Sequence, residues 1–119
     1  MIEYGKLYDI YDRDGIYALQ LEVGDVCFQN CIYCYMNALP EERNTLSDEQ
    51  LSRIIEDSAK LGIVAIEWLG GEPLLRDSIF EHMAQARELG FRNNMWTGGL
   101  PFENDEIVRK TAELCSHGL

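Results

Sequence analysis

Basic residues and long apolar runs are both scarce in this chain. Its 119 residues include 10 Lys and Arg against 21 Asp and Glu, which gives a formal net charge of −11 at pH 7. Such an excess of acidic residues disfavours binding to a phosphate backbone or to an anionic membrane surface. No stretch approaches the length of a membrane span, and the N-terminal run from Met1 to Lys6 leads into no apolar segment. We therefore expect a cytoplasmic protein that binds neither nucleic acid nor membrane.

Cysteine is not scarce, and the expected cytoplasmic location indicates which chemistry these thiols can have. The chain has four cysteines, and cytosolic thiols stay reduced and can bind metal. Two disulfides are disfavoured because nothing else indicates secretion. The length suits one small domain, and neither short repeats nor low-complexity tracts stand out.

Hydrophobic periodicity predicts a regular alternation of strands and helices after a polar lead at residues 1–15. Ser47 and Gln50 form a capping-box pattern at the start of the first predicted helix, and Gly62 follows its last turn. Residues 63–69 are almost continuously apolar, as is typical of a strand covered on both faces. The pattern predicts strands at 16–23, 63–69 and 91–97, each followed by a helix, at about 47–62, 77–90 and 104–116.

Strands joined by helices indicate an α/β fold with a parallel sheet. Leu119 would begin a further strand, and three strands leave an exposed edge that a fourth would cover. We therefore interpret the chain as the N-terminal part of a longer protein.

Three of the cysteines lie close together after the first predicted strand. Cys27, Cys31 and Cys34 have the spacing C-x3-C-x2-C. Three thiolates can hold three irons of a cubic iron–sulfur cluster, which leaves the fourth iron open to a small molecule. Electron-transfer clusters are normally closed by four cysteines, and an open position is typical of metal sites that act on a substrate.

Two glycine-containing loops follow the other predicted strands. The run Gly70-Gly71-Glu72-Pro73 ends the second strand, and a Thr97-Gly98-Gly99 turn ends the third. The carboxyl ends of parallel strands lie at one edge of a sheet, where such folds place their sites. We therefore expect both loops to lie near the cysteines.

These motifs together resemble the radical S-adenosylmethionine (radical SAM) superfamily. The resemblance is carried by the cysteine spacing, by an aromatic residue just before the last cysteine, and by the run Gly70–Arg76 (GGEPLLR). It extends over essentially the whole chain from the first strand onward. It implies that residues 16–119 are the first three strand–helix units of a core domain, the first half of a partial (β/α) barrel.

The resemblance also implies ligands for two cofactors. Cys27, Cys31 and Cys34 would bind a 4Fe–4S cluster, whose open iron would chelate the amine and carboxylate of S-adenosylmethionine. Tyr33 would lie near the adenine. No catalytic side chain is assigned.

The glycine loops are assigned to the same cofactor by the resemblance. Gly70, Gly71 and Glu72 would receive the methionyl ammonium, and Thr97 is assigned to cofactor binding. The assignment is physically reasonable because glycines let a backbone approach a ligand closely and a carboxylate complements an ammonium.

The implied activity is reductive cleavage of S-adenosylmethionine to a 5′-deoxyadenosyl radical, which abstracts hydrogen from a peptide or small-molecule substrate. The cofactors supply this chemistry and the protein positions them. An electron donor such as a flavodoxin or ferredoxin is implied as a partner. The sequence departs from the family at Leu69, where Ser or Thr is frequent, and at Gly98, where Asn is usual.

Two other interpretations of the cysteines stay open. A structural zinc site would need a fourth ligand from His82, Cys115 or His117. A non-enzymatic electron carrier would need Cys115 as the fourth cysteine, although Cys115 lies in an apolar helix pattern that favours a small buried side chain.

Several other residues have structural interpretations. Gly70-Gly71 could form only a tight strand exit, with Glu72 capping a short helix. We expect His82 to face solvent, and Trp68 and Trp96 to belong to the core or to a site wall.

Overall fold

The computed structural model describes residues 4–115, and its strands form one parallel sheet in the order β1-β2-β3. The elements are α1 (Tyr4–Asp12), β1 (Ala18–Glu22), α2 (Asp48–Lys60), β2 (Ala65–Leu69), the 3-10 helix η1 (Pro73–Leu75), α3 (Ile79–Glu88), β3 (Arg92–Met95), the 3-10 helix η2 (Leu100–Glu103) and α4 (Asp105–Leu114). The predicted α/β fold with three parallel strands is confirmed. The predicted end of the third helix near Ser116 and the strand expected from Leu119 lie outside the described residues.

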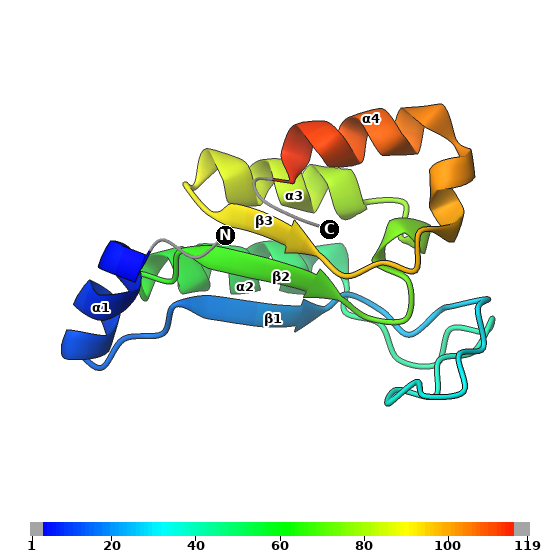
Figure 1. Cartoon of the computed structure of the whole chain (residues 1–119), viewed down its shortest axis with the longest axis horizontal. Helices are drawn as coiled ribbons and strands as arrows, with labels where there is room; N and C mark the ends of the chain where they lie inside the picture. Colours follow the sequence, from blue (N-terminus) through cyan, green and yellow to red (C-terminus); the bar gives the residue numbers. More distant parts are fainter. Residues whose placement is uncertain (1–3, 116–119) are drawn as a thin grey trace.

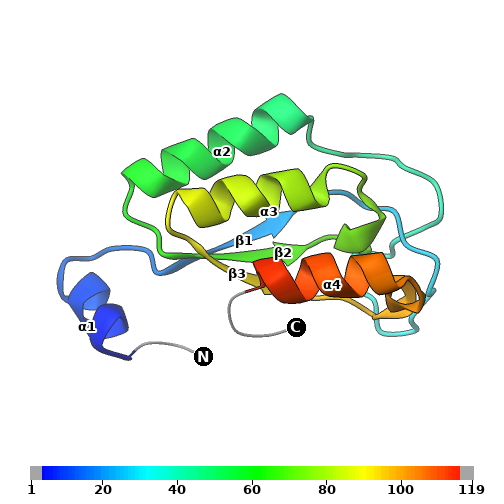
Figure 2. The same ribbon diagram turned by 90° about the horizontal axis from the view of Figure 1, so that it is seen from above.

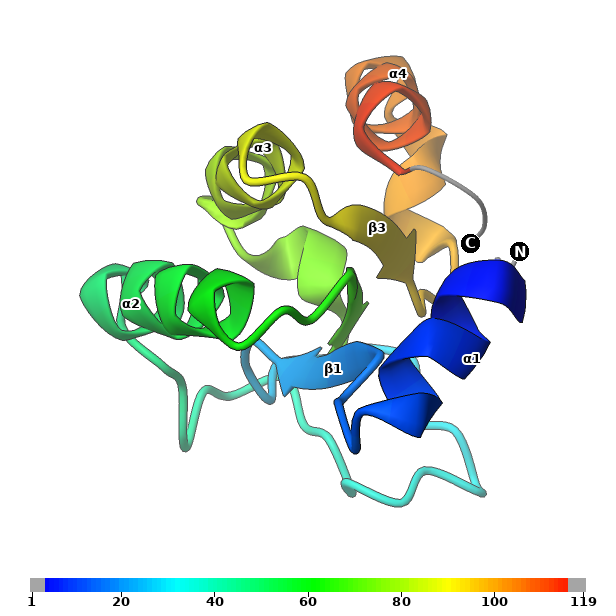
Figure 3. The same ribbon diagram turned by 90° about the vertical axis from the view of Figure 1, so that its left-hand side faces the viewer.

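Helices α2, α3 and α4 lie together on one side of the sheet, whereas α1 lies on the other side near the starts of the strands (Figures 1 and 3). Seen from above, α2 and α3 run side by side, roughly along the direction of the strands (Figure 2). The loop that carries the cysteines extends beyond the arrowheads of the strands in Figure 1. The chain therefore separates a helix-covered body from a group of loops at the carboxyl edge of the sheet.

The hydrophobic core lies between the sheet and these three helices. Leu21 in β1, Trp68 in β2 and Met95 in β3 share one register row, and all three are buried. Alternation along a strand places these residues on the helix side. The helices contribute further buried side chains to the same cluster, among them Leu51, Ile55, Ile79, Met83 and Ala86.

The opposite face of the sheet carries polar side chains. Gln20, Glu67 and Asn94 form one register row across the three strands. The Trp96 indole N–H donates to Glu67 Oε2 (3.0 Å), and the Tyr35 hydroxyl donates to Glu22 Oε1 (2.8 Å). The apolar run at 63–69 therefore includes a carboxylate that faces away from the helices.

Local signals explain where the helices begin and end. The predicted capping box at α2 is present, since Gln50 N donates to Ser47 Oγ (3.1 Å) and Ser47 N donates to Gln50 Oε1 (2.9 Å). Asn104 Oδ1 accepts from Glu106 N (2.9 Å) at the start of α4. Gly62 follows α2 with φ 77°, a conformation that glycine adopts without steric cost.

Two features differ from the sequence expectations. Helix α1 lies in the polar lead, for which the sequence predicts no element; it has no acidic residue in its first turn, and Ile10 is its one buried residue. His82 is 6% exposed and packs between α3 and α2, so the expectation that it faces solvent is wrong.

Among residues 4–115, no helix is long and apolar enough to cross a membrane.

Candidate functional site

The cysteine loop is anchored where it leaves β1. Cys27 N donates to Leu39 O (2.9 Å), which closes the loop at its base. The Asp25 carboxylate accepts from Arg43 N (3.1 Å) and Asn44 N (3.0 Å), and the first of these bonds is the main reason that the pKa of Asp25 lies below its ordinary value. The segments before and after the cysteines are therefore held together by a nearly buried carboxylate.

Two consecutive turns shape the loop between these anchors. Cys34 N donates to Cys31 O (3.1 Å), and Asn37 N donates to Cys34 O (3.3 Å). Asn30 and Asn37 both have φ 48°, a left-handed conformation that asparagine adopts more readily than most residues. The backbone therefore brings the predicted ligands onto one short, tightly turned segment.

The thiols in this loop have the chemistry that a metal cluster requires. Cys27, Cys31 and Cys34 are free and half-buried. The backbone N–H of Ala38 hydrogen-bonds the Cys34 sulfur and is the main factor that lowers the pKa of this thiol. A lowered pKa favours the thiolate, which is the form that binds metal.

The described side chains do not converge on one point. Thiolates on one tetrahedral zinc ion would stand about 4 Å apart, given Zn–S bonds of about 2.3 Å. Among residues 4–115, no group of three His, Cys, Asp or Glu side chains is gathered closely enough to hold one metal ion. A cubic cluster holds each cysteine on a different iron, so its donors need not converge on one point.

Gly70 and Gly71 lie directly against the exit of β1. Gly71 N donates to Gly24 O (2.9 Å), and Glu72 N donates to Val26 O (2.8 Å). A Cβ at Gly70, which has φ 144°, would lie 2.5 Å from Gly24 O, and a Cβ at Gly71 would overlap Val26 O. These glycines let the two loops approach each other. Close packing is therefore one reason for their presence, in addition to the predicted role in cofactor binding.

Glu72 is the centre of the hydrogen-bond network at this edge. It is 6% exposed, and its carboxylate accepts from Thr97 Oγ1 (2.7 Å), Gly98 N (2.9 Å) and Leu74 N (3.2 Å). The interpretation of Glu72 as the cap of a short helix is confirmed by η1. A carboxylate offers about four acceptor positions, so a further donor such as an ammonium can be accommodated; that role stays a prediction.

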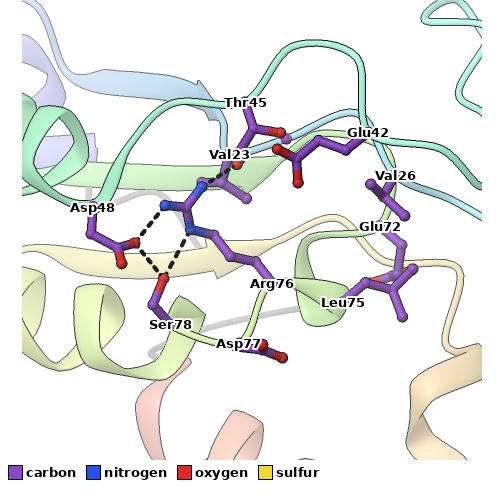
Figure 4. A pocket seen from close by; sticks show the side chains of 11 residues that line it. Val23, Val26, Glu42, Thr45, Asp48, Glu72, Leu75, Arg76, Asp77 and Ser78 are labelled. Atoms are coloured by element: carbon purple, nitrogen blue, oxygen red, sulfur yellow. Dashed lines mark hydrogen bonds and ion pairs between the residues drawn. The ribbon is translucent and has the colours of Figure 1, made fainter.

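Arg76, to which no sequence pattern assigns a separate role, connects the same loop to the exit of β1 and to the start of α2. Its Nη1 donates to Val23 O and Leu46 O, both at 2.7 Å, and Nη2 pairs with Asp48. Figure 4 shows this guanidinium between Asp48 and Ser78, beside a cavity of about 310 Å³. Arg76 directs these bonds to groups within the chain, and it therefore holds the glycine loop against the start of α2.

His82 contributes to the same set of contacts around Asp48. Its Nε2 lies 3.0 Å from Asp48 Oδ1. Hydrogen bonds from Ser78, Arg76 and His82, in that order, hold the pKa of Asp48 well below its ordinary value. The link joins α2 to α3 across residues that are far apart in the sequence, so no local pattern predicts it.

The remaining predicted residues lie in contrasting environments. Tyr33 is 85% exposed at the cysteine loop, whereas Trp68 is fully buried in the core and Trp96 is 61% exposed. Cys115 follows the end of α4, packs against the core, and has its pKa raised to about 11 by burial. That end of α4 lies over β3 and away from the cysteine loop (Figure 1), since Leu114 O accepts from Asn93 Nδ2 (3.1 Å). Cys115 is therefore not a fourth ligand in this arrangement.

Comparisons with known proteins agree on the family. The model of the Radical SAM superfamily matches residues 21–117. A protein named probable GTP 3′,8-cyclase from Methanothermobacter thermautotrophicus is 34% identical over 108 residues, which are 88% of this chain and 35% of the relative. Fe-coproporphyrin III synthase from Methanosarcina barkeri is 36% identical over 89 residues, which are 74% of this chain and 22% of the relative.

Solved structures show the same fold. BtrN in complex with AdoMet and 2-DOIA matches with a TM-score of 0.71 and 20% identity, over 87% of this chain and 44% of BtrN. Streptococcus suis SuiB bound to S-adenosylmethionine matches with a TM-score of 0.70 and 18% identity, over 97% of this chain and 27% of SuiB.

Each relative is longer than the chain, which spans about a third of the length of the cyclase and less of the synthase. The family model nevertheless covers most of the described residues, including all three cysteines and the Gly-Gly-Glu-Pro loop. The chain belongs to the radical SAM superfamily.

Proposed function

We propose that this chain carries the cluster-binding part of a radical SAM enzyme. The observation that carries the proposal is the direct joining of two loops. Glu72 N, in the Gly-Gly-Glu-Pro loop, donates to Val26 O (2.8 Å), and Val26 immediately precedes the first cysteine. The donor set for a cluster and the backbone suited to receive an amino-acid cofactor therefore lie side by side at one edge of the sheet.

In this proposal, Cys27, Cys31 and Cys34 hold a 4Fe–4S cluster with one iron left open for the methionyl amine and carboxylate of S-adenosylmethionine. When bound together and reduced, this pair supplies a 5′-deoxyadenosyl radical for hydrogen abstraction. The backbone N–H groups near Cys34 favour its thiolate, and the Asp25 anchor keeps the loop closed.

Other side chains orient the cofactor. Tyr33, exposed at the loop, is available to cover the adenine. Glu72 offers its remaining acceptor position to the methionyl ammonium beside the backbone of Gly70 and Gly71. Thr97 acts through Glu72, because its hydroxyl lies within 2.8 Å of both carboxylate oxygens.

The substrate is a peptide or a small molecule that meets the polar face of the sheet. Glu22 and Glu67 lie on this face, each hydrogen-bonded by an aromatic side chain. The relatives differ in what their names say they make, from GTP 3′,8-cyclase to Fe-coproporphyrin III synthase, and SuiB is known bound to the precursor peptide SuiA. A flavodoxin or ferredoxin would supply the electron.

Electron paramagnetic resonance tests the proposal on protein reconstituted anaerobically with iron and sulfide. We expect the signal of the reduced cluster to change when S-adenosylmethionine is added, because the cofactor binds the open iron. Cys115→Ala should behave like the unchanged protein, and Cys34→Ala should give no such signal. A cluster signal that S-adenosylmethionine leaves unchanged would contradict the open-iron site and favour an electron carrier.

A further inference from the structure

Gln29 lies with its side chain against Gly98, in space that any residue other than glycine at position 98 would fill with its Cβ. It lies between the first two cysteines, and its side-chain amide sits where a Cβ of residue 98 would be. Gly98 is not among the glycines with positive φ, so backbone conformation does not explain why glycine is present there. The Gln29 amide, which lies against its Cα, does.

The position of Gly98 is itself fixed. Its N–H donates to Glu72 Oε2 (2.9 Å), and the adjoining Thr97 hydroxyl donates to Glu72 Oε1 (2.7 Å). These two hydrogen bonds hold the turn in place, and the side-chain amide of Gln29 packs against it. This contact joins the cysteine loop to the turn after β3, about 70 residues later in the sequence.

The same amide reaches one of the predicted cluster ligands. Cys31 Sγ lies 3.9 Å from Gln29 Oε1, with the thiol as donor. A cysteine that binds iron does so as a thiolate, which accepts hydrogen bonds and no longer donates one. Rotation of the terminal amide of Gln29 exchanges its oxygen for its NH2 group, which carries two donors. An N–H···S bond then replaces the S–H···O bond without any movement of the backbone.

We propose that Gln29, seated over Gly98, donates a hydrogen bond to the Cys31 thiolate and thereby raises the reduction potential of the cluster. Hydrogen bonds to cluster sulfurs help to set the potential, and groups around metal ligands tune the metal. The direction follows because the reduced cluster carries more negative charge, which a donor stabilises. The inference rests on the cluster assigned under the proposed function. Gln29 is a positioning residue here, since it acts through Cys31.

A redox titration followed by electron paramagnetic resonance tests this inference on the reconstituted protein. Gln29→Leu keeps the side-chain size but removes the amide, so the potential should become more negative. We expect about a tenfold change in the reduction equilibrium, or about 59 mV for one electron. Gln29→Glu places a carboxylate beside the thiolate and should shift the potential at least as far.

Gly98→Ala provides an independent test because it leaves the sequence of the cysteine loop unchanged. The added methyl group displaces the flexible end of Gln29 and should shift the potential in the same direction with little loss of thermal stability. Gln29→Leu combined with Gly98→Ala should shift it no further than Gln29→Leu alone, since both changes remove one interaction.

The outcomes separate this inference from the function on which it rests. Unchanged potentials in Gln29→Leu and Gly98→Ala, with clusters assembled, would overturn the role of Gln29 and leave the proposed function intact. Additive shifts in the double variant would also overturn it. Failure of the unchanged protein to assemble a cluster would overturn both. Should Gln29→Leu lose iron during preparation, Gly98→Ala still decides the matter.

Discussion

The helix-covered face of the sheet and the loops at its carboxyl edge are held by different kinds of contact. On the covered face, apolar side chains such as Trp68 and Met95 are fully or almost fully buried. At the edge, backbone groups and a few polar side chains join segments that are distant in sequence, as in the bonds from Glu72 to Val26 and from Gly98 to Glu72. Changes to the body should therefore act mainly on folding, and changes to the edge mainly on the cofactors.

The largest effect on folding should come from the body. Trp68→Ala should lower the free energy of unfolding by about 3–5 kcal/mol, because it leaves a cavity in the core and removes the indole donor to Asn93 Oδ1 (2.9 Å). Urea unfolding measures this loss. Trp96→Ala is a matched control at an exposed position, where we expect a change of about 0.5 kcal/mol. Similar losses in both variants would contradict the distinction between body and edge.

A smaller effect on folding but a clear effect on binding should come from Thr97. Thr97→Val keeps the side-chain shape and removes the hydroxyl that donates to Glu72, so stability should fall by about 1–2 kcal/mol. The affinity for S-adenosylmethionine, measured by equilibrium dialysis on reconstituted protein, should also fall because the carboxylate loses its orientation. Thr97→Ser should retain both properties. Unchanged affinity in Thr97→Val would remove Thr97 from the cofactor site.

The smallest effect should appear only in acid. The pKa of Asp48 in the folded chain lies below its ordinary value of 3.8, so its contribution to stability is fully present above about pH 4 and declines as the pH falls toward the folded value. Urea midpoints measured from pH 6 to pH 3 should therefore fall more steeply in the unchanged protein than in Asp48→Asn. Parallel curves would show that the bonds from Ser78, Arg76 and His82 do not stabilise the ionised form.

The sequence predicts the body well because its signals are local. The capping box at Ser47 and the glycine after α2 mark helix ends within a few residues, and apolar periodicity marks the strands. Helix α1 lacks such signals: Gly5 lies in its first turn, and its tyrosines at positions 4, 8 and 11 are exposed. Only tertiary structure reveals it.

The candidate site is predictable in its motifs but not in its contacts. The cysteines and the Gly-Gly-Glu-Pro run are short local patterns. The contacts of Gln29 with Gly98, of His82 with Asp48 and of Thr97 with Glu72 join residues that are 25 or more positions apart. They depend on how the strands and helices pack, and short local sequence patterns do not reveal this packing. His82 illustrates this, since the partner that draws it inward lies on another helix.

Iron and sulfide content tests the central claim most directly. We expect anaerobically reconstituted protein to hold about four irons and four sulfides per chain, as a cubic cluster requires. Cys115→Ala should hold the same amounts, whereas alanine at position 27, 31 or 34 should abolish or badly degrade the cluster. About one zinc per chain, or loss of the cluster in Cys115→Ala, would contradict a cluster held by Cys27, Cys31 and Cys34 alone.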